Sequence, residues 1–519
     1  MNGKLPVWMV SVVGCAVMGL FGPEGGNAIA GPLAIENKVP AQAVAEPALK
    51  KGDRLVFLGD SITSQSFYTV LVANYILGAW PELELSVGQC ALYGKTTAFF
   101  LKHAQANCID LMKPTIVSSC YGRNDCVKGT PREYEQDTRK LIDIFRKNNA
   151  RVMLATVPIC GGNDDAAKAL NLKIAAYADV GRRLAAETGC PLADFNGAMI
   201  QASEKMTRVR GGFYDIVARD GVHPDWHGHM AMAIAFLRGL GLGNREIARI
   251  EFDPAAGKAT AGEGHKVIEV KGENVTVESK RFPLLFYKGH PSQALSDMWD
   301  IAEQMGFFDD LGRFMLVVKN LKPGHYAIIW SGAGGKVFTA EQLAKGVNLA
   351  HEFPQTPFQD YQTRLRGLVS AKLRMDNLIV EGKTYHRDKS AEIDKMFRTH
   401  FMSKADPNLD VATVAREEPA RLRELADKSL GAVQVPIAHT ILVTEVIPET
   451  QAIENAVKAA EGKLPYDKAT PPACRLNLPA YQVRFFKAAV PGDKKAPAPA
   501  ILVQVEAKTG KVLGVTELK

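Results

Sequence analysis

Three residue types that together support nucleophilic catalysis occur in this sequence beside short apolar segments. Ser61 lies in the sequence GDSIT at 59–63, directly after an apolar run. Far along the chain, the sequence DGVHP at 220–224 places Asp220 three positions before His223. A carboxylate at this spacing can fix the tautomer of the imidazole through Nδ1–H, which leaves the other ring nitrogen free to accept the proton of a serine hydroxyl. Ser61, His223 and Asp220 are therefore the candidate catalytic residues.

Two further loops carry groups that can donate hydrogen bonds to an oxyanion. Gly94 follows the second apolar run, and a glycine there lets a backbone N–H approach a ligand without a side chain in the way. Asn124, in YGRND at 121–125, follows the third run and offers a side-chain amide. Together with the backbone N–H of Ser61 at the start of a helix, where the dipole favours negative charge, they form a candidate oxyanion hole. Each segment taken alone is also typical of a helix cap or a turn.

Taken in order, these segments resemble the sequence blocks of the SGNH subgroup of GDSL-type serine esterases and hydrolases. Ser61 heads the first block, Gly94 matches the second, Asn124 lies in a Gly-x-Asn-Asp third block, and Asp220-x-x-His223 matches the last. The resemblance covers residues 51–243 and implies a three-layer, flavodoxin-like α/β domain with a parallel sheet. It also implies hydrolysis through an acyl-serine intermediate, without a cofactor.

Two departures from the family blocks bear on the shape of the substrate cleft rather than on a catalytic group. Lys95 stands where the second block often has an acidic residue, and SQS at 64–66 stands where the first block often has a glycine. Five side chains near the blocks are candidates to line the cleft, although core or surface positions suit them as well. They are Tyr68, Tyr93, Arg123, Tyr214 and Trp226.

The histidines around the last block suggest an alternative, a metal-dependent hydrolase. His223, His227 and His229 are close in sequence, as the ligands of a metal site often are. The His-Glu-x-x-His pattern is missing, however, and no partner cluster of carboxylates stands out. We therefore expect no metal, and a structural role for His229.

The segments around the candidate site alternate between strand and helix patterns. Short, largely apolar strands are predicted at 54–58, 83–87, 114–120, 151–157 and 191–195. Segments with helical periodicity lie between and after these strands, at 65–79, 96–111, 131–148, 164–188 and 226–238. This alternation predicts βαβ units and a parallel sheet covered on both faces, in which the strand ends meet at one edge. Residues 51–243 are therefore expected to form one α/β domain.

The remainder of the chain predicts three further regions. Residues 247–350 show strand-like alternation and an inserted helix at 292–305, which indicates a mostly β accessory domain. Residues 355–430 are charged with helical periodicity, which indicates a helical hairpin or projecting arm. Residues 431–519 are expected to form a small α+β domain. Its first strand is predicted at 440–446, and a Pro/Lys-rich excursion at 491–499 precedes its last strand.

Length and composition exclude several protein classes. A chain of 519 residues is too long for one hydrophobic core, since cores stop growing near ~250–300 residues. With 46% hydrophobic and 23% charged residues, it is neither disordered, nor collagen-like, nor a multi-span membrane protein. The net charge of +7 is small for this length and lacks a long run of like charges, so we expect no nucleic-acid partner.

The N-terminus predicts export to the periplasm, the cell surface or the medium. Residues 1–30 combine a basic start, an apolar run at 6–21 and the small-residue cleavage site AIA at 28–30, and 31–50 reads as a linker. The alternative is a lipobox, VVGC at 12–15, in which Cys15 carries a lipid and attaches the protein to a membrane. The seven later cysteines are expected to be mostly buried thiols, with Cys120 and Cys126 the pair most worth checking.

These observations predict an exported serine esterase that hydrolyses acyl esters, acetyl esters above all, on carbohydrate. Its partner would be an acylated small molecule or a polysaccharide. Two alternatives remain at this point: a lipolytic esterase or thioesterase that uses the same residues, and a polymer-binding surface protein that carries a vestigial esterase domain.

Overall fold

Five parallel strands form the sheet of the N-terminal α/β domain. They are β1 (Arg54–Gly59), β2 (Ser86–Ala91), β3 (Ile116–Cys120), β4 (Arg151–Ala155) and β5 (Leu192–Ala193). Their order, β2-β1-β3-β4-β5, is the flavodoxin-like order, and all neighbours pair in parallel. Because both faces are covered, the strands are almost continuously buried. The parallel α/β core expected from the sequence is thus confirmed.

The computed structural model describes residues 48–284, 286, 293–331, 334–401, 409–461, 471–486 and 499–518, all within the compact unit Ala43–Lys519. The expected leader at 1–30, Cys15, most of the linker at 31–50 and nearly all of the excursion at 491–499 lie outside these residues. Within the described ranges, none of the helices combines the length and the apolar character that crossing a membrane requires.

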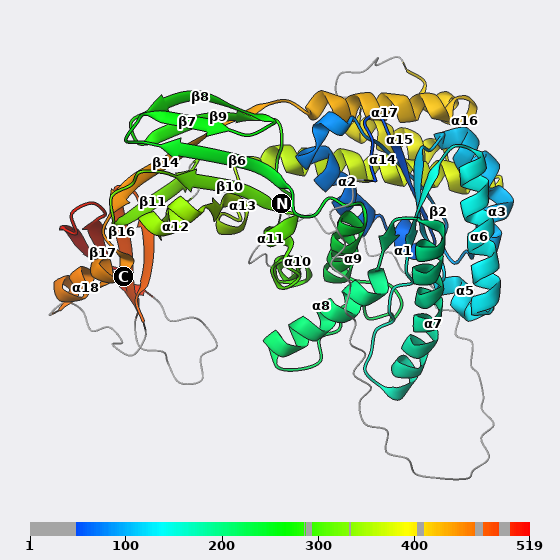
Figure 1. Cartoon of the computed structure of the whole chain (residues 1–519), viewed down its shortest axis with the longest axis horizontal. Coiled ribbons are helices and arrows are strands. Elements are labelled where there is room, and N and C mark those ends of the chain that lie inside the picture. Colours follow the sequence, from blue (N-terminus) through cyan, green and yellow to red (C-terminus); the bar gives the residue numbers. More distant parts are fainter. Residues whose placement is uncertain are drawn as a thin grey trace, which may run out of the picture. The chain divides into compact units, whose positions relative to one another are not determined.

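Two groups of helices cover the sheet. One consists of α2 (Phe67–Ala79), α8 (Phe195–Arg210) and α9 (Trp226–Gly239), and the other of α3 (Thr97–Ala104), α6 (Pro131–Lys147) and α7 (Asp165–Thr188). Right-handed crossovers place the two groups on opposite faces (Figure 1). Side chains of Thr130 and Asp164 cap α6 and α7, as their sequences suggest.

Short elements at the strand ends complete the domain. They are α1 (Ser61–Ser64), η1 (Pro81–Leu83), η2 (Gln105–Ile109), α4 (Asp110–Met112) and α5 (Arg123–Lys128). The strand predicted at 83–87 begins later, at Ser86, because the residues from Pro81 form a 3₁₀ turn. Helix α8 was not expected from the periodicity, although Asp194 caps it through a hydrogen bond from the N–H of Gly197 (3.1 Å).

Two further sheets follow the α/β domain. The first has the order β13-β10-β6-β7, with β6 (Glu246–Asp253), β7 (Lys258–Ala261), β10 (Arg313–Val318) and β13 (Val347–Asn348). The second has the order β12-β11-β14-β9-β8, with β8 (His265–Lys271), β9 (Asn274–Ser279), β11 (His325–Trp330), β12 (Lys336–Thr339) and β14 (Ile437–Val446). Four helices accompany them: α10 (Gln293–Gln304), α11 (Phe307–Asp310), α12 (Ala340–Lys345) and α13 (Leu349–Glu352).

Strand β14 lies in a different place from the one its sequence position suggested. It belongs to the region expected as a separate small domain at 431–519, yet it pairs antiparallel with both β9 and β11 in the centre of the second sheet. Buried side chains fix this position: Trp330 Nε1 donates to His439 Nδ1 (2.9 Å), and His439 Nε2 contacts Ser279 Oγ (2.8 Å). A boundary at 431 therefore does not separate one sheet from another.

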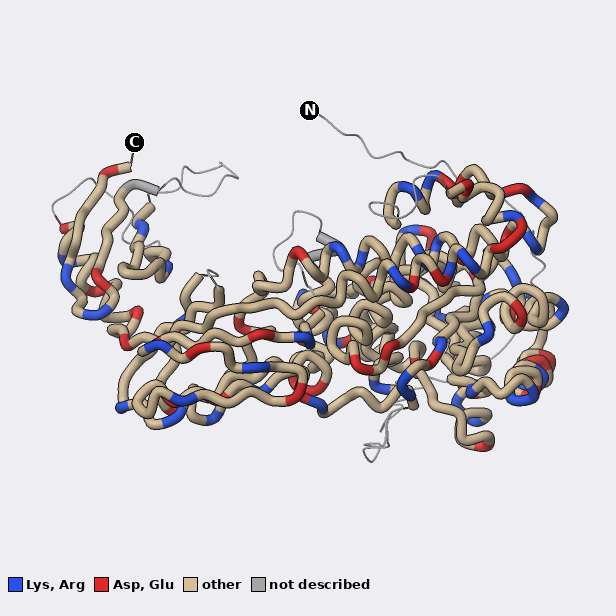
Figure 2. Tube along the Cα trace, turned by 90° about the horizontal axis from the view of Figure 1, so that it is seen from above, with Lys and Arg blue, Asp and Glu red and all other residues tan. Residues whose placement is uncertain are grey.

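Helices also occupy the region expected as a hairpin or projecting arm. They are α14 (Gln359–Tyr385), α15 (Ser390–His400), α16 (Val411–Glu417) and α17 (Pro419–Val433), and α14, α15 and α17 lie side by side in Figure 1. Rather than projecting, α14 packs on α2 and on the edge strand β2. Basic and acidic residues are interspersed along these helices (Figure 2).

Buried side chains of α14 satisfy backbone groups at the open edge of β2. Asp376 accepts from the N–H of Gln89 (3.1 Å), Asn377 accepts from the N–H of Ala91 (3.3 Å), and the Lys372 ammonium donates to the carbonyl of Val87 (2.5 Å). An edge strand that is covered rather than solvated needs such partners. The helix therefore replaces the strand that β2 lacks.

The C-terminal residues form a fourth sheet with its own apolar core. Strands β15 (Ala473–Asn477), β16 (Ala480–Phe486), β17 (Pro499–Glu506) and β18 (Val512–Glu517) pair in sequence order, and α18 (Glu449–Ala460) packs on them. The seven cysteines at 90, 108, 120, 126, 160, 190 and 474 are free thiols, and all but Cys474 are buried.

Candidate active site

Ser61 stands where β1 passes into α1, at the carboxyl edge of the sheet. The turn requires a glycine at position 59, because a Cβ there would lie 2.1 Å from Thr63 Oγ1 and 2.9 Å from the carbonyl oxygen of Cys120. Asp60 caps α1 by accepting the N–H of Ile62 through Oδ1 (3.0 Å). Ser61 itself is only half-buried.

His223 and Asp220 extend from Ser61 as one hydrogen-bonded chain. Nε2 of His223 lies 2.8 Å from Ser61 Oγ, and Nδ1 lies 2.6 Å from Asp220 Oδ2. The other oxygen of Asp220 accepts the backbone N–H groups of Val222 (2.9 Å) and His223 (3.0 Å). Partial burial raises the pKa of Asp220, but these hydrogen bonds outweigh it and hold the pKa below its ordinary value. An ionised Asp220 favours the tautomer in which Nε2 accepts from Ser61.

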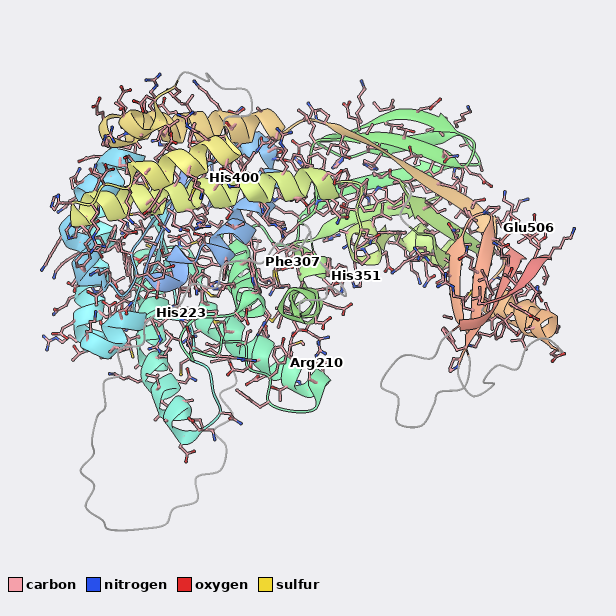
Figure 3. All side chains as sticks on the ribbon, turned by 180° about the vertical axis from the view of Figure 1, so that it is seen from behind. Arg210, His223, Phe307, His351, His400 and Glu506 are labelled. Carbon is pink, nitrogen blue, oxygen red and sulfur yellow. The ribbon has the colours of Figure 1, made fainter. Side chains whose placement is uncertain are left out.

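Local contacts fix the loop that carries His223. The N–H of Ala218 donates to the carbonyl of His223 (2.8 Å), and Val217 forms a bridge with Pro224. Trp226, which follows at the start of α9, stacks on Phe67 at the start of α2 with ring centroids 4.1 Å apart. This stack ties the segment after His223 to the segment after Ser61. His223 is labelled in Figure 3.

Asn124 lies beside the nucleophile turn, after β3. Gly122 enters the turn with φ of +114°, and a Cβ there would lie 2.4 Å from Val157 Cγ2, so only glycine fits. The buried carboxylate of Asp125 accepts the N–H of Thr97 (3.0 Å) and of Gly122 (3.2 Å), which joins the β2–α3 loop to the start of α5. Burial raises the pKa of Asp125.

The Asn124 amide connects two of the predicted site segments. Its Nδ2 donates to Asp60 Oδ2 (3.0 Å) and to the carbonyl of Lys95 (3.2 Å). Burial raises the pKa of the Asp60 carboxyl to about 7. Gly94, next to Lys95, is exposed with φ of +68°, and its carbonyl accepts from Lys128 Nζ (3.0 Å). The structure thus links Asn124, in the first turn of α5, both to Asp60 beside Ser61 and to the loop that carries Gly94.

The other histidines of the last block have separate partners. His227 Nε2 contacts the carbonyl of Asp215 (3.0 Å), and His229 Nε2 contacts Gln65 Oε1 (3.1 Å). Burial lowers the pKa of His229 to about 3, so it is neutral in the folded protein. Across the described ranges, no group of three or more His, Cys, Asp or Glu side chains is arranged to hold a metal ion.

The five candidate lining residues fall in different environments. Tyr68 is fully buried and contacts Thr63 Oγ1 (2.9 Å), and Tyr214 donates to Asp297 (2.5 Å). Tyr93 is 62% exposed beside Gly94. Trp226 takes part in the stack described above, and Arg123 is buried next to Asn124.

One residue that contacts the site was missed by the sequence reasoning. Asn377 of α14 donates through Nδ2 to the carbonyl (3.3 Å) and the hydroxyl (3.2 Å) of Ser64, while its Oδ1 accepts the N–H of Ala91. It therefore links the end of α1 to the end of β2. No local pattern marks it, because its partners lie about three hundred positions earlier in the chain.

Comparison with known proteins places the α/β domain in a family. Residues 57–231 match the GDSL-like lipase/acylhydrolase family. These residues form a GDSL-like hydrolase domain. The chain is also 25% identical over 214 residues to an acetylxylan esterase of Geobacillus stearothermophilus, an alignment that covers 37% of this chain and 94% of that protein. The GDSL-like domain is, on this basis, a carboxylic ester hydrolase.

Solved structures resemble either the GDSL-like domain or most of the chain. A crystal structure of the same Geobacillus stearothermophilus acetylxylan esterase is 26% identical and covers 37% of this chain and 96% of its own, with a TM-score of 0.33. A gut microbial diltiazem-metabolizing enzyme is 20% identical with a TM-score of 0.59, and the match covers 77% of this chain and 98% of that one. The fold shared with the second structure therefore extends well beyond the GDSL-like domain.

Proposed function

We propose that the chain is an exported serine esterase in which Ser61 is the nucleophile, His223 the general base and Asp220 the residue that orients His223. The observation that carries this proposal is the chain of two short hydrogen bonds, 2.8 Å from Ser61 Oγ to His223 Nε2 and 2.6 Å from His223 Nδ1 to Asp220. In this geometry the imidazole can accept the serine proton as Oγ attacks an ester carbonyl.

The proposed reaction has two steps, acylation of Ser61 and hydrolysis of the acyl-serine. Attack of Ser61 Oγ on the carbonyl forms a tetrahedral intermediate, and His223 gives the accepted proton to the alcohol as the ester C–O bond breaks. Water then attacks the acyl-serine, His223 accepts one of its protons, and the return of that proton to Ser61 Oγ releases the acid. The half-buried position of Ser61 gives the ester and the water access.

An oxyanion hole made of the backbone N–H groups of Ser61 and Gly94 and the Asn124 amide completes the proposal. The bond from Asn124 Nδ2 to Lys95 O, at 3.2 Å, is the longer of its two. That hydrogen is the one available to a developing oxyanion, while the bond to Asp60 keeps the amide oriented. Hydrogen-bond donors that are held in place before the reaction stabilise the developing oxyanion more than donors that must first reorganise.

The proposed substrate is an acyl ester, acetyl above all, on a carbohydrate. Support comes from the relative named as an acetylxylan esterase, which matches the GDSL-like domain over 94% of its own length. The exposed ring of Tyr93 beside Gly94 offers a surface on which a sugar ring can stack. The neighbour described as diltiazem-metabolizing favours a small-molecule ester as the second candidate. Export is proposed on the apolar leader at 1–30.

A panel of esters tests this proposal. Acetylated xylo-oligosaccharides, short-chain alkyl esters and long-chain esters are assayed with the wild type and with Ser61→Ala. We expect the acetylated glycans to give the highest kcat/KM and Ser61→Ala to lose activity on every ester. Preference for long chains would favour a lipolytic enzyme instead. Absence of hydrolysis throughout the panel would favour a polymer-binding protein with a vestigial domain.

A further inference from the structure

Arg123 is a buried guanidinium whose hydrogen-bonding groups are not used by the protein. The residue is 7% exposed, and both Nε and Nη1 are buried without a hydrogen-bond partner. Two other arginines among the described residues are as deeply buried, and each is paired: Arg281 with Glu82 (2.8 Å) and Arg423 with Asp376 (2.7 Å). A guanidinium stays charged at any relevant pH, and a buried charge without a partner is costly. The fold thus supplies a hydrogen-bonded carboxylate to those two arginines but not to Arg123.

The position of Arg123 puts this charge at the candidate active site. It follows β3, which lies between β1 and β4, and directly precedes Asn124. Burial raises the pKa of Asp60, after β1, and of the Cys160 thiol, after β4, and the charge of Arg123 opposes the rise in both. Arg123 stands at the exit of β3, between the exits of β1 and β4, at the edge that carries Ser61.

The carboxylate of Asp60, next to Ser61 in the sequence, already accepts hydrogen bonds from other groups. One oxygen of Asp60 accepts the N–H of Ile62 and the other accepts the Asn124 amide. Asp125, two residues from Arg123, accepts the backbone N–H groups of Thr97 and Gly122. Neither carboxylate forms a hydrogen bond with the guanidinium, whose Nε and Nη1 are without a protein partner. An anion from outside the protein could therefore supply the missing acceptor.

We propose that Arg123 binds an anionic group of the substrate, so that the enzyme prefers esters with a carboxylate close to the scissile bond. This proposal rests on the proposed esterase function and narrows its substrate class. A guanidinium binds a carboxylate through two parallel hydrogen bonds, which orients the bound molecule as well as holding it. The carboxylate can belong to the acyl part, as in the half-ester of a dicarboxylic acid, or to the alcohol part, as in an acetylated uronic acid.

Two matched pairs of esters distinguish these sources. On the acyl side, monomethyl succinate is compared with methyl butyrate, and on the alcohol side, acetylated glucuronic acid is compared with acetylated glucose. In at least one pair we expect the wild type to favour the anionic ester in kcat/KM by about 10- to 100-fold, as a charged hydrogen bond would give. The pair that shows the preference identifies the source of the anion.

Variants at position 123 assign the preference to the guanidinium. Arg123→Gln is expected to lose the preference while it retains hydrolysis of the neutral ester, and Arg123→Lys to keep part of it. Arg132→Gln, which removes an exposed charge near the start of α6, is the control and should keep the full preference. Because Arg123 lacks a protein partner, Arg123→Gln should fold with a Tm equal to or above that of the wild type.

Two results would overturn the proposal. One is a wild type without preference in either pair. The other is equal losses on anionic and neutral esters in Arg123→Gln, whether or not its Tm is lowered. Failure of the esterase function itself is recognised separately, because Ser61→Ala would then hydrolyse the neutral esters as well as the wild type does.

Discussion

At the scale of single residues, Asn124 is the group whose present contacts bear most on the proposed chemistry. Its amide is held between Asp60 and the Lys95 carbonyl rather than pointing freely into solvent. Asp60 in turn serves two donors, the helix cap and Asn124. The proposed oxyanion donor, the turn of Ser61 and the β2–α3 loop are therefore joined by a single pair of side chains, Asn124 and Asp60.

Replacing Asn124 by alanine tests the role of this amide. We expect Asn124→Ala to lower kcat by ~10²–10³ with little change in KM, because the lost donor acts on the transition state and not on the bound ester. Steady-state kinetics on a simple acetyl ester measures the effect. Gln136→Ala, which removes an exposed amide from α6, is the control. A rise in KM with unchanged kcat would assign Asn124 to substrate binding instead.

The acidic partner of His223 gives a second test at this scale. In Asp220→Asn, the side chain can still accept the N–H groups of Val222 and His223, but its amide no longer accepts from Nδ1. The imidazole then adopts the tautomer that cannot accept the proton of Ser61, and kcat should fall by ~10⁴. Unchanged Tm would show that the loop is intact, whereas a loss below 10-fold would remove Asp220 from the mechanism.

At the scale of secondary-structure elements, helix α14 supports the site from outside the GDSL-like domain. Its buried side chains take the place of a neighbouring strand at β2, and Asn377 joins that strand to the end of α1. The two segments joined in this way are those that present Ser61 and lead to Gly94. A shift of this helix therefore moves the nucleophile and one proposed oxyanion donor together.

Asn377 should consequently act as a positioning residue. We expect Asn377→Ala to lower kcat by roughly 10- to 10²-fold through displacement of α1, while KM changes little. Asn377→Asp keeps the acceptor for the Ala91 N–H but loses the donor to Ser64, so its kcat should lie near that of the alanine variant. Full activity in Asn377→Asp would show that the contact with Ser64 is not needed for positioning.

The sequence predicted elements well where local patterns decide the structure. The strands around Leu55–Leu58 and Ile116–Cys120 are buried on both faces, so a largely apolar run between polar residues was enough to locate them. The candidate site residues were found because Ser61, Gly94 and Asn124 follow predicted strands, and Asp220 and His223 precede the last helix, in short motifs of fixed spacing. The strand Arg54–Gly59, with Ser61 in the turn that follows it, is one example.

Local sequence patterns could not predict which strands pair when they lie far apart in the chain. Strand β14 alternates between buried and part-exposed residues like any half-covered strand, and nothing local reveals that its neighbours are β9 and β11, far earlier in the chain. The contacts of Asn377 are hidden in the same way. Arg123 was noted as a candidate lining residue, but its lack of partners follows only from the packing around it.

Buried histidines predict how stability depends on pH. Burial lowers the pKa of His229 and of His439 to about 3, below the value near 6.5 of an unfolded chain. Between these values the unfolded state binds protons that the folded state does not, so the free energy of unfolding falls as the pH drops from 6.5 toward 3, by at most ~1.4 kcal/mol per pH unit for each group. Asp60, whose pKa is raised to about 7, acts in the opposite direction between 3.8 and 7.

Thermal unfolding between pH 7 and pH 4 measures this dependence. We expect Tm to fall toward acid in the wild type, and to fall less steeply in His229→Leu, which removes one of these two imidazoles of lowered pKa. His400→Gln, at an exposed histidine labelled in Figure 3, is the control and should keep the wild-type slope. An unchanged slope in His229→Leu would contradict a neutral, buried His229.

At the scale of the whole molecule, the described regions differ in how closely they are tied to the site. Helices α14 and α17 contribute side chains to the edge of β2, through Lys372 and Asp427, and Asn377 of α14 also contacts Ser64 at the end of α1. The C-terminal sheet β15–β18 has a core of its own and follows β14 in the chain. The GDSL-like domain thus depends on part of the rest of the chain and not on all of it.

Two truncations separate these dependencies. Removal of residues 447–519 should leave kcat on an acetyl ester within about 2-fold, because the deletion spares every contact of the site, and additive behaviour is usual for distant groups. Truncation after residue 243 removes Lys372, Asp376 and Asn377, and should lower both Tm and kcat. Circular dichroism and steady-state kinetics measure both effects. Wild-type activity in the shorter chain would show that α14 is dispensable.

The most direct test of the account is whether Ser61 is the nucleophile. A fluorophosphonate probe reacts with an activated serine, and peptide mass spectrometry identifies the modified residue. We expect stoichiometric labelling at Ser61 in the full chain, strongly slowed labelling in His223→Ala, and none in Ser61→Ala. Labelling of a different serine, or equal labelling of Ser61→Ala, would contradict the assignment of the active site.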